Sequence, residues 1–352
     1  MNEARANRIL AALKEQGVDQ MLITDPMSIC YLTGISMAPI ERFYALLLKA
    51  DGHHYYFLNH LFNVPGDVGV EKVWYSDTDP VPEIVAARLD KNAVLGVDKD
   101  LKARFLLPLM EMKAAAGFVN GSLAVDITRG VKDTEEQKKM RISSAINDKA
   151  MAKFKGLIHE GVSEKEVADQ MLQIYLDLGA DGYSFEPLVA FGANAADPHH
   201  SPDDTVVKPG DCVLFDVGCI KDGYCSDMTR TFYFKTVSDA HREVYETTKA
   251  SNETAISKIR PGVPLYQLDA AAKGWGPNFN HRLGHFIGLS EHEFGDVSSA
   301  NTWEAKPGMI FSIEPGIYLT GDTGVRVEDL VLVTEDGVEV LNHYPKELQI
   351  IE

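Results

Sequence analysis

Helix-type and strand-type hydrophobic patterns alternate along the first third of the chain. Residues 3–17 place apolar side chains on one helical face, and residues 20–24 form a short apolar run typical of a buried strand. Both patterns recur, so we expect an α/β domain with a mixed sheet that ends near residue 125. The other elements expected in it are strands within 43–58, 70–76 and 93–98 and helices at about 80–90 and 101–116.

A long helix should connect this region to the rest of the chain. Thr134 and Gln137 have the spacing of a capping box, and they predict a linker helix at about 134–159. The length of 352 residues also favours two domains, which we place at 1–125 and 126–352. The elements expected after the linker are a helix at 164–178 with a capping signal at Ser163, a helix at about 239–258, and strands within 309–319 and 325–337.

The stretch 214–232 carries the first candidate chemistry. Two strand-type runs flank a turn, which predicts a β-hairpin with Asp216 and Asp227 on one face. A turn centred between Lys221 and Asp222 would place the aspartates directly opposite each other, whereas a turn centred on Asp222-Gly223 would place them diagonally. Opposed carboxylates repel unless a cation lies between them, which suggests Mg²⁺, Mn²⁺ or Zn²⁺. An exposed hairpin face with two solvated aspartates explains this stretch equally well.

Composition and charge limit the possible partners. Apolar residues make up 45% of the chain, which supports well-packed cores. There are 34 Lys and Arg against 52 Asp and Glu, a net charge of −18 without a basic tract, so nucleic acid and anionic membranes are poor partners. No apolar stretch has the length of a membrane span, and the charged N-terminal segment is unlike a secretory signal. The four cysteines lack zinc-type spacing, and we expect a reduced, cytoplasmic protein.

Three downstream segments contain more residues that could bind a metal. The segment 281–292 holds three histidines among glycines, and Glu314 lies in an apolar strand, where a lone carboxylate is costly to bury. Arg326 and Glu328 share a predicted strand face, so the arginine can brace the carboxylate. Each signal is weak by itself, because single histidines and glutamates are more often structural. Together, two Asp, one His and two Glu fit a pair of bridged metal ions better than one zinc ion.

The order of these motifs resembles a known family. The segments DVG, SDMTRTF, HRLGH, SIEPGIY and VRVED, in this order over 133–352, are similar to those of metallopeptidases with the pita-bread fold. The first 125 or so residues resemble, less closely, the N-terminal domain of prolidases, aminopeptidase P and creatinase. The resemblance implies an α+β fold class, with a C-terminal pita-bread catalytic domain preceded by a smaller α/β domain.

The resemblance also implies a metal centre and a mechanism. Two divalent ions would be bound, most often Mn²⁺ and alternatively Co²⁺ or Zn²⁺, and Asp227 and Glu328 would bridge them. A hydroxide bridging the metals would be the nucleophile, and Glu314 would act as general acid/base. The implied metal ligands are Asp216, Asp227, His285, Glu314 and Glu328.

Within the family, the chain length and the C-terminal end resemble bacterial Xaa-Pro dipeptidases (prolidases), which hydrolyse the peptide bond before proline. His199 would then contact the leaving half of the substrate, and His292 the substrate carbonyl and the intermediate. Arg282, next to His281, is a candidate for holding the C-terminal carboxylate of a dipeptide. Arg326 is a further candidate for orienting the substrate.

Arg42 is the remaining candidate for substrate binding. It lies in a loop, residues 38–43, that resembles a prolidase loop reaching the active site, in some members from the partner subunit of a homodimer. A homodimer acting on small peptides is therefore expected. Alternatively, Glu41, Arg42 and Arg282 could belong to a surface ion-pair set.

The chain also departs from the family pattern. Ile40 replaces a loop histidine, Phe286 replaces a glycine and could narrow the pocket, and the segment 268–276 is shortened. These departures affect the expected substrate range more than the hydrolytic chemistry. The alternatives are an Xaa-Pro aminopeptidase that acts on longer peptides and a non-hydrolytic family member.

Overall fold

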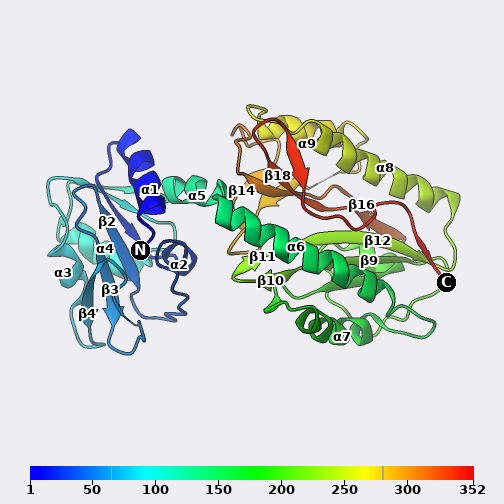
Figure 1. The fold of residues 1–352 in the computed structure, drawn as a ribbon, viewed down its shortest axis with the longest axis horizontal. Helices are drawn as coiled ribbons and strands as arrows, with labels where there is room; N and C mark the ends of the chain where they lie inside the picture. Colours follow the sequence, from blue (N-terminus) through cyan, green and yellow to red (C-terminus); the bar gives the residue numbers. More distant parts are fainter. Residues whose placement is uncertain (65, 280) are drawn as a thin grey trace. The chain divides into compact units, whose positions relative to one another are not determined.

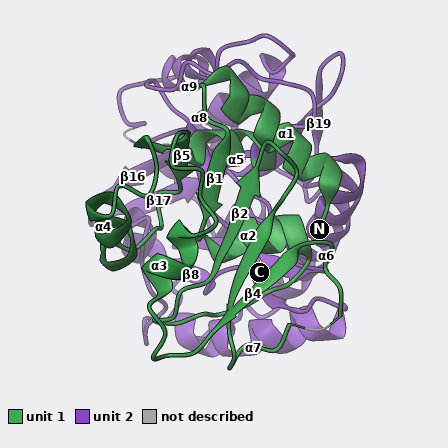
Figure 2. Cartoon of the chain, turned by 90° about the vertical axis from the view of Figure 1, so that its left-hand side faces the viewer, with its two compact units in different colours: residues 1–129 green, residues 130–352 purple. Residues whose placement is uncertain are grey.

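The chain forms two compact units. The computed structural model describes residues 1–64, 66–279 and 281–352. Unit 1 comprises Met1–Arg129 and unit 2 comprises Gly130–Glu352, and Figure 2 colours them separately. The boundary expected at residue 125 would cut helix α5 (Ser122–Gly130), whose residues Ala124 and Val125 are buried. The division therefore falls a few residues later than expected, near the end of this helix.

Unit 1 is built on a six-stranded mixed sheet with the strand order β4-β3-β2-β1-β5-β6. Strand β1 pairs antiparallel with β2 and parallel with β5, as expected for a mixed sheet. The hydrophobic pattern does not predict helix α2, which is marked by its ends: Asp25 as N-cap, Pro26 in the first turn, and Gly34 in the left-handed conformation. Before α5, the elements are α1 (Glu3–Glu15), β1 (Gln20–Ile23), α2 (Pro26–Thr33), β2 (Ala45–Lys49), β3 (Tyr55–Asn59), β4 (Glu71–Tyr75), α3 (Val81–Ala86), β5 (Val94–Val97), α4 (Ala103–Glu111) and β6 (Gly117–Asn120).

Within the described residues, unit 2 contains four sheets, with the strand orders β11-β10-β7, β20-β12-β9-β8, β14-β13-β15-β18-β19 and β16-β17. Its helices are α6 (Thr134–Lys155), α7 (Glu164–Asp177), the 3₁₀ helix η1 (Gly192–Ala196), α8 (Asp239–Ser257) and α9 (Leu265–Lys273). Its strands are β7 (Gly182–Tyr183), β8 (Leu188–Phe191), β9 (Cys212–Val217), β10 (Cys219–Lys221), β11 (Tyr224–Cys225), β12 (Met228–Phe234), β13 (Gly284–Phe286), β14 (Glu293–Val297), β15 (Ile310–Ile313), β16 (Gly316–Leu319), β17 (Thr323–Arg326), β18 (Asp329–Val333), β19 (Val338–Val340) and β20 (Ile350–Ile351).

Two hydrophobic cores hold the sheets of unit 2 between its helices. Helices α6 and α7 pack against β8, β9 and β12 in one core, and α8 and α9 pack against β13, β15 and β18 in another. In Figure 1, α7 and the α8–α9 pair accordingly lie on opposite sides of the strands. Among the described helices, none combines the length and the apolar character needed to cross a membrane.

The predicted hairpin forms, and its register chooses between the two arrangements that the sequence allows. Strand β9 pairs with β12, with Asp216 opposite Thr229, and β10 and β11 continue the ladder to the tip. The turn is centred on Asp222 and Gly223, which have φ values of 50° and 81°. Positive φ at both positions is what a type I′ turn requires. Asp216 and Asp227 are therefore diagonal neighbours on one face.

The capping box of helix α6 lies one residue before the predicted one. The carboxylate of Asp133 accepts hydrogen bonds from the backbone N–H groups of Glu135 and Glu136, at 3.1 and 3.0 Å. The Glu136 carboxylate accepts one from the Asp133 N–H at 2.9 Å. The predicted box of Thr134 and Gln137 is therefore wrong, because Oδ1 of Asp133 satisfies two orphan donors and Thr134 becomes the first helical residue.

Asp133→Ala should lower the free energy of unfolding by about 1 kcal/mol, because it removes the acceptor for the N–H groups of the first turn. Thr134→Ala, at an exposed position, should change it by less than about 0.5 kcal/mol. Urea unfolding followed by circular dichroism measures both. A larger loss for Thr134→Ala would place the cap at Thr134 instead.

Candidate metal centre

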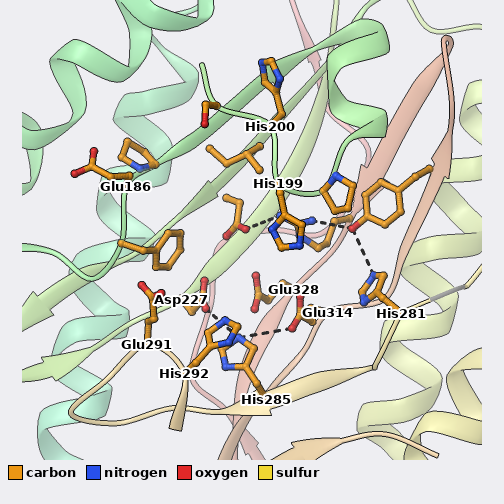
Figure 3. A pocket seen from close by; sticks show the side chains of 18 of the residues that line it. Glu186, His199, His200, Asp227, His281, His285, Glu291, His292, Glu314 and Glu328 are labelled. Carbon is orange, nitrogen blue, oxygen red and sulfur yellow. Dashed lines mark hydrogen bonds and ion pairs between the residues drawn. The ribbon is translucent and has the colours of Figure 1, made fainter. Parts of the chain in front are cut away.

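The predicted site residues of unit 2 gather in one pocket, and Figure 3 shows their side chains converging on it. The cavity has a volume of about 570 Å³, within the range of roughly 300–1,000 Å³ that is usual for small-molecule sites. The residues singled out from the sequence that line it are Asp216, Asp227, His285, Glu314, Glu328, His199, His281, Arg282, His292 and Arg326.

Arg42 belongs to unit 1, where the structure places it in an ion-pair set. Its Nε and Nη2 atoms donate to the two carboxylate oxygens of Asp77, both at 2.9 Å, and Nη1 lies 2.9 Å from Glu41 Oε1. This matches the surface ion-pair alternative for Arg42 and Glu41. A role of Arg42 in substrate binding stays a prediction.

Strands and strand ends supply the five predicted metal residues. Asp216 lies in β9, and Asp227 immediately precedes β12. His285 lies in β13 and Glu314 follows β15, its N–H donating to the carbonyl of Leu283 just before β13. Glu328 lies between β17 and β18, and its N–H donates to the Thr229 carbonyl in β12. Backbone hydrogen bonds between strands therefore fix the backbone positions from which these side chains extend.

Three carboxylates of this group have a buried acceptor atom without a donor. Asp227 and Glu328 are 4% and 1% exposed. Burial raises the pKa of both well above the usual value, and repulsion from neighbouring carboxylates raises it further. Asp216 Oδ1, Asp227 Oδ1 and Glu328 Oε1 receive no hydrogen bond from any described residue. Uncompensated buried acceptors of like charge are costly, and a cation is the group that would satisfy them.

His285 presents its Nε2 atom to this group. Its Nδ1 atom lies 3.2 Å from the carbonyl oxygen of Phe286, so a proton on Nδ1 has an acceptor. Nε2 lies 3.4 Å from Asp227 Oδ2 and 3.6 Å from Glu314 Oε1. In this tautomer the Nε2 lone pair faces the carboxylates, which is how a backbone carbonyl commonly orients a metal-binding histidine.

Arg326 is buried, and its guanidinium is held by three partners. Nε donates to Thr229 Oγ1 at 2.9 Å, Nη1 to the Tyr318 hydroxyl at 2.7 Å, and Nη2 to Asp216 Oδ2. Burial lowers its pKa, but Tyr318 and Asp216 together raise it well above the usual value. The predicted common strand face of Arg326 and Glu328 is wrong, because β17 ends at Arg326. The charge of Arg326 still counteracts the rise in the pKa of Glu328, and Thr229 Oγ1 bonds to both side chains.

Two supporting residues lie within the SDMTRTF segment but are not among the predicted site residues. Thr229 Oγ1 donates to Glu328 Oε2 at 2.7 Å, and its alternation with Asp227 along the strand is a signal that could have identified it. Arg230 is fully buried, and its Nη1 donates to the carbonyls of Thr229 and Glu328. Its Nη2 donates to Asp329 Oδ1 at 2.7 Å. Arg230 has no local signal, because Glu328 and Asp329 lie about a hundred residues along the chain.

A pair of histidines and an arginine form one side of the pocket. The rings of His285 and His292 are stacked, with centroids 3.9 Å apart. Arg282 Nη2 lies 3.0 Å from His292 Nδ1 and donates to it, so a neutral His292 carries its proton on Nε2. Burial, His285 and Arg282 lower the pKa of His292 to about 4. Burial also lowers the pKa of His281, whose Nε2 lies 3.4 Å from the Tyr318 hydroxyl.

Phe286 does not line the pocket as predicted, whereas Glu291, which is not among the predicted site residues, does. Phe286 is fully buried, with its ring 5.6 Å from that of Phe311 and 6.0 Å from that of Trp303. It therefore packs in the core and does not narrow the pocket. Glu291 adds a half-buried carboxylate to the pocket wall, and burial raises its pKa.

In the part of the chain that the structure describes, two groups of side chains have the spacing of metal ligands. They are Asp227, His285 and Glu328, and Glu164, His200 and Asp203, each with ligand atoms within 4.8 Å of one another. In the second group, both Glu164 oxygens already accept hydrogen bonds from backbone N–H groups. The first group has acceptors without donors and one imidazole nitrogen directed at them. The first group therefore fits a cation, and the second is occupied by the chain's own donors.

A buried centre rich in carboxylates, with one imidazole, is typical of metal-dependent hydrolases. The chain matches the model of metallopeptidase family M24 over residues 138–335 and that of the creatinase/prolidase N-terminal domain over residues 5–131. The protein belongs to metallopeptidase family M24, whose members bind divalent metals. The expected fold, a catalytic domain of this family preceded by a smaller α/β domain, is confirmed.

Known proteins resemble the chain over nearly its whole length. An uncharacterized peptidase of Staphylococcus aureus strain MSSA476 is 37% identical over 357 aligned residues, which cover 97% of this chain and 99% of the relative. The crystal structure of a prolidase from Thermococcus sibiricus is 32% identical, with a TM-score of 0.89 and 99% of both chains covered. The dipeptidase PepE of Mycobacterium ulcerans is 31% identical, with a TM-score of 0.93 and coverage of 99% and 97%.

Metal-free protein should gain thermal stability when Mn²⁺ is added, because the cation binds the clustered carboxylates of the folded chain only. A hundredfold excess over Kd corresponds to about 2.7 kcal/mol. Differential scanning fluorimetry measures the change in Tm. Glu328→Gln should remove most of the gain, whereas Glu335→Gln, at an exposed position, should keep it. An equal gain in Glu328→Gln would mean that Mn²⁺ binds elsewhere.

Proposed function

We propose that this protein is an Xaa-Pro dipeptidase that uses two divalent metal ions, most often Mn²⁺ and alternatively Co²⁺ or Zn²⁺. The observation that carries the proposal is the convergence of five side chains, three of them with buried acceptors that lack a donor. The similarity to solved structures described as a prolidase and a dipeptidase supports the choice of substrate. The proposed ligands are Asp216, Asp227, His285, Glu314 and Glu328.

Divalent cations in this centre would supply Lewis acidity and would lower the pKa of a water molecule. Among the ligands, Glu314 is suited to move the proton. Its side chain is 16% exposed, against 6% for Asp227, and Ser312 Oγ lies 3.2 Å from its Oε1. We assign to Glu314 the transfer of a proton from the attacking water to the departing proline nitrogen.

His292 and His199 would bind the peptide around the bond that breaks. With its pKa lowered to about 4, His292 is neutral near pH 7, and its Nε2–H is available to donate to the substrate carbonyl oxygen. His199 lines the pocket, where its charge contributes to lowering the pKa of His292, and we assign it to the leaving half. His281 and Arg326 complete the proposed substrate-binding set.

Arg282 is the proposed anchor for the C-terminal carboxylate of a dipeptide. It is exposed and lines the pocket, and among the described residues its guanidinium has one hydrogen bond, to His292. Most of its five N–H donors are therefore left for a bidentate carboxylate partner. An Xaa-Pro aminopeptidase, the alternative, would not need this anchor, because its substrates continue beyond proline. A homodimer in which Arg42 contributes to substrate binding remains part of the proposal.

With Mn²⁺ added, an Xaa-Pro dipeptide should be hydrolysed with a kcat/KM at least about tenfold above that of the matching Xaa-Pro-Yaa tripeptide, because only the dipeptide places a carboxylate at Arg282. Arg282→Ala should remove most of this preference. Chromatographic detection of the released amino acids measures both rates. A clear preference for the tripeptide would replace the dipeptidase assignment by the aminopeptidase alternative.

Glu314→Gln should lower kcat by about 10²- to 10⁴-fold, because an amide cannot carry the proton between water and the proline nitrogen. Glu304→Gln, which removes a charge at an exposed position, is the matched control and should leave kcat unchanged. Steady-state kinetics together with circular dichroism separates lost chemistry from lost fold. Activity retained in a folded Glu314→Gln variant would show that another group moves the proton.

A further inference from the structure

One wall of the pocket is an irregular segment, residues 191–204, which we call the histidine loop. Beyond the short helix η1, it has no helix or strand among its residues 197–204. The loop residues that line the pocket are Pro198, His199, His200, Ser201 and Pro202. A backbone hydrogen bond from the Lys165 N–H to the Asp203 carbonyl, 3.0 Å long, holds the end of the loop. Residues 197–202 have no sheet ladder, so the position of this part depends on side-chain contacts.

The carboxylate of Glu164, the first residue of helix α7, accepts four hydrogen bonds from described residues, all of them in the histidine loop. Its Oε1 atom accepts from Phe191 N at 2.7 Å and from Asn194 Nδ2 at 3.0 Å. Its Oε2 atom accepts from His200 Nε2 at 2.7 Å and from Asp203 N at 3.1 Å. These partners lie at both ends of the loop and in its middle, so one carboxylate ties the whole segment to α7.

The neighbouring histidines of the loop point in opposite directions. Figure 3 shows His199 directed toward the cluster of metal residues and His200 directed away from it. His200 bonds to Glu164. His199 instead contributes to lowering the pKa of His292, which lines the same pocket. The bond between Glu164 and His200 therefore sets the backbone position from which His199 extends.

Only a carboxylate satisfies this arrangement. The Glu164 side chain is 0% exposed, so any unmatched partner would be buried. Each oxygen faces one backbone N–H, from Phe191 or from Asp203, and a backbone donor cannot be reversed. A glutamine at this position has only one acceptor oxygen. In either orientation of its amide, the NH₂ group would face one of these two N–H donors and could not accept from it.

We propose that Glu164 is a positioning residue for peptide binding, which holds the histidine loop so that His199 and the flanking prolines meet the leaving half of the substrate. The inference rests on the proposed function and names a group outside the metal centre. Its effect should fall on substrate binding more than on the chemical step, because its carboxylate bonds to the loop and to the end of β8, and none of these bonds reaches a strand that carries a proposed metal ligand.

A double-mutant cycle between Glu164→Gln and His199→Ala tests this role. Glu164→Gln should raise KM for an Xaa-Pro dipeptide about tenfold, the equivalent of one lost buried hydrogen bond, and change kcat by less than about threefold. In the His199→Ala background, the same substitution should change kcat/KM by less than about twofold, because the group that it positions is gone. Steady-state kinetics of the four proteins with Mn²⁺ gives the coupling.

Glu166→Gln is the matched control. Glu166 lies in the same helical turn, is exposed, and caps Ser163, whose N–H and hydroxyl a glutamine oxygen can also accept. It should leave KM and kcat unchanged. If Glu164→Gln does not fold, Asn194→Ala removes one bond of the same carboxylate without altering it, and it replaces Glu164→Gln in the cycle.

The outcomes separate this inference from the proposed function. Equal effects of Glu164→Gln with and without His199 would overturn the positioning role, as would a loss confined to kcat. If the wild-type protein cleaves no peptide with any added metal ion, both the proposed function and this inference are wrong. A wild-type enzyme that is active but shows an additive cycle would remove the inference alone.

Discussion

The accumulation of like charge in one buried pocket is the constraint on which the rest of unit 2 depends. The carboxylates of Asp216, Asp227, Glu314 and Glu328 face a single cavity, and the pKa values of Asp227 and Glu328 are raised by burial and by this repulsion. Such a cluster would spread apart unless strands held it in place or cations neutralised it. Because the strands come from several sheets with paired ladders, the cost of the cluster is distributed over the whole unit, and cation binding and folding become linked.

Polar contacts behind the cluster determine which atoms remain for a cation. Thr229 donates to one oxygen of Glu328, and Arg326 donates to one oxygen of Asp216. The other oxygen of each carboxylate has no donor among the described residues. The Phe286 carbonyl does the same for His285 by accepting at Nδ1. Contacts of this kind orient ligands before any metal arrives, and they are as specific as the ligands themselves.

The residues proposed for chemistry and those proposed for recognition have different supports. The metal residues come from strands and strand ends, whereas His199, Arg282 and His292 lie in irregular segments. Irregular segments tolerate sequence change better than paired strands do, so residues that recognise a substrate commonly lie in them. Glu164 is an example, because its single buried carboxylate binds the irregular histidine loop to helix α7.

Local pattern determined the alternation of elements in unit 1, the hairpin and the face shared by Asp216 and Asp227, since periodicity and turn residues act within a few positions. The motif order also identified the residues of the pocket. Tertiary structure decided what depends on distant neighbours. It determined that the hairpin turn is centred on Asp222-Gly223 and that Phe286 packs in the core. It also placed Arg326 in a hydrogen bond with Asp216, 110 residues away, instead of with Glu328. It also joined Glu164 to the histidine loop, because only the folded chain brings this buried acceptor to backbone donors 27 and 39 residues away.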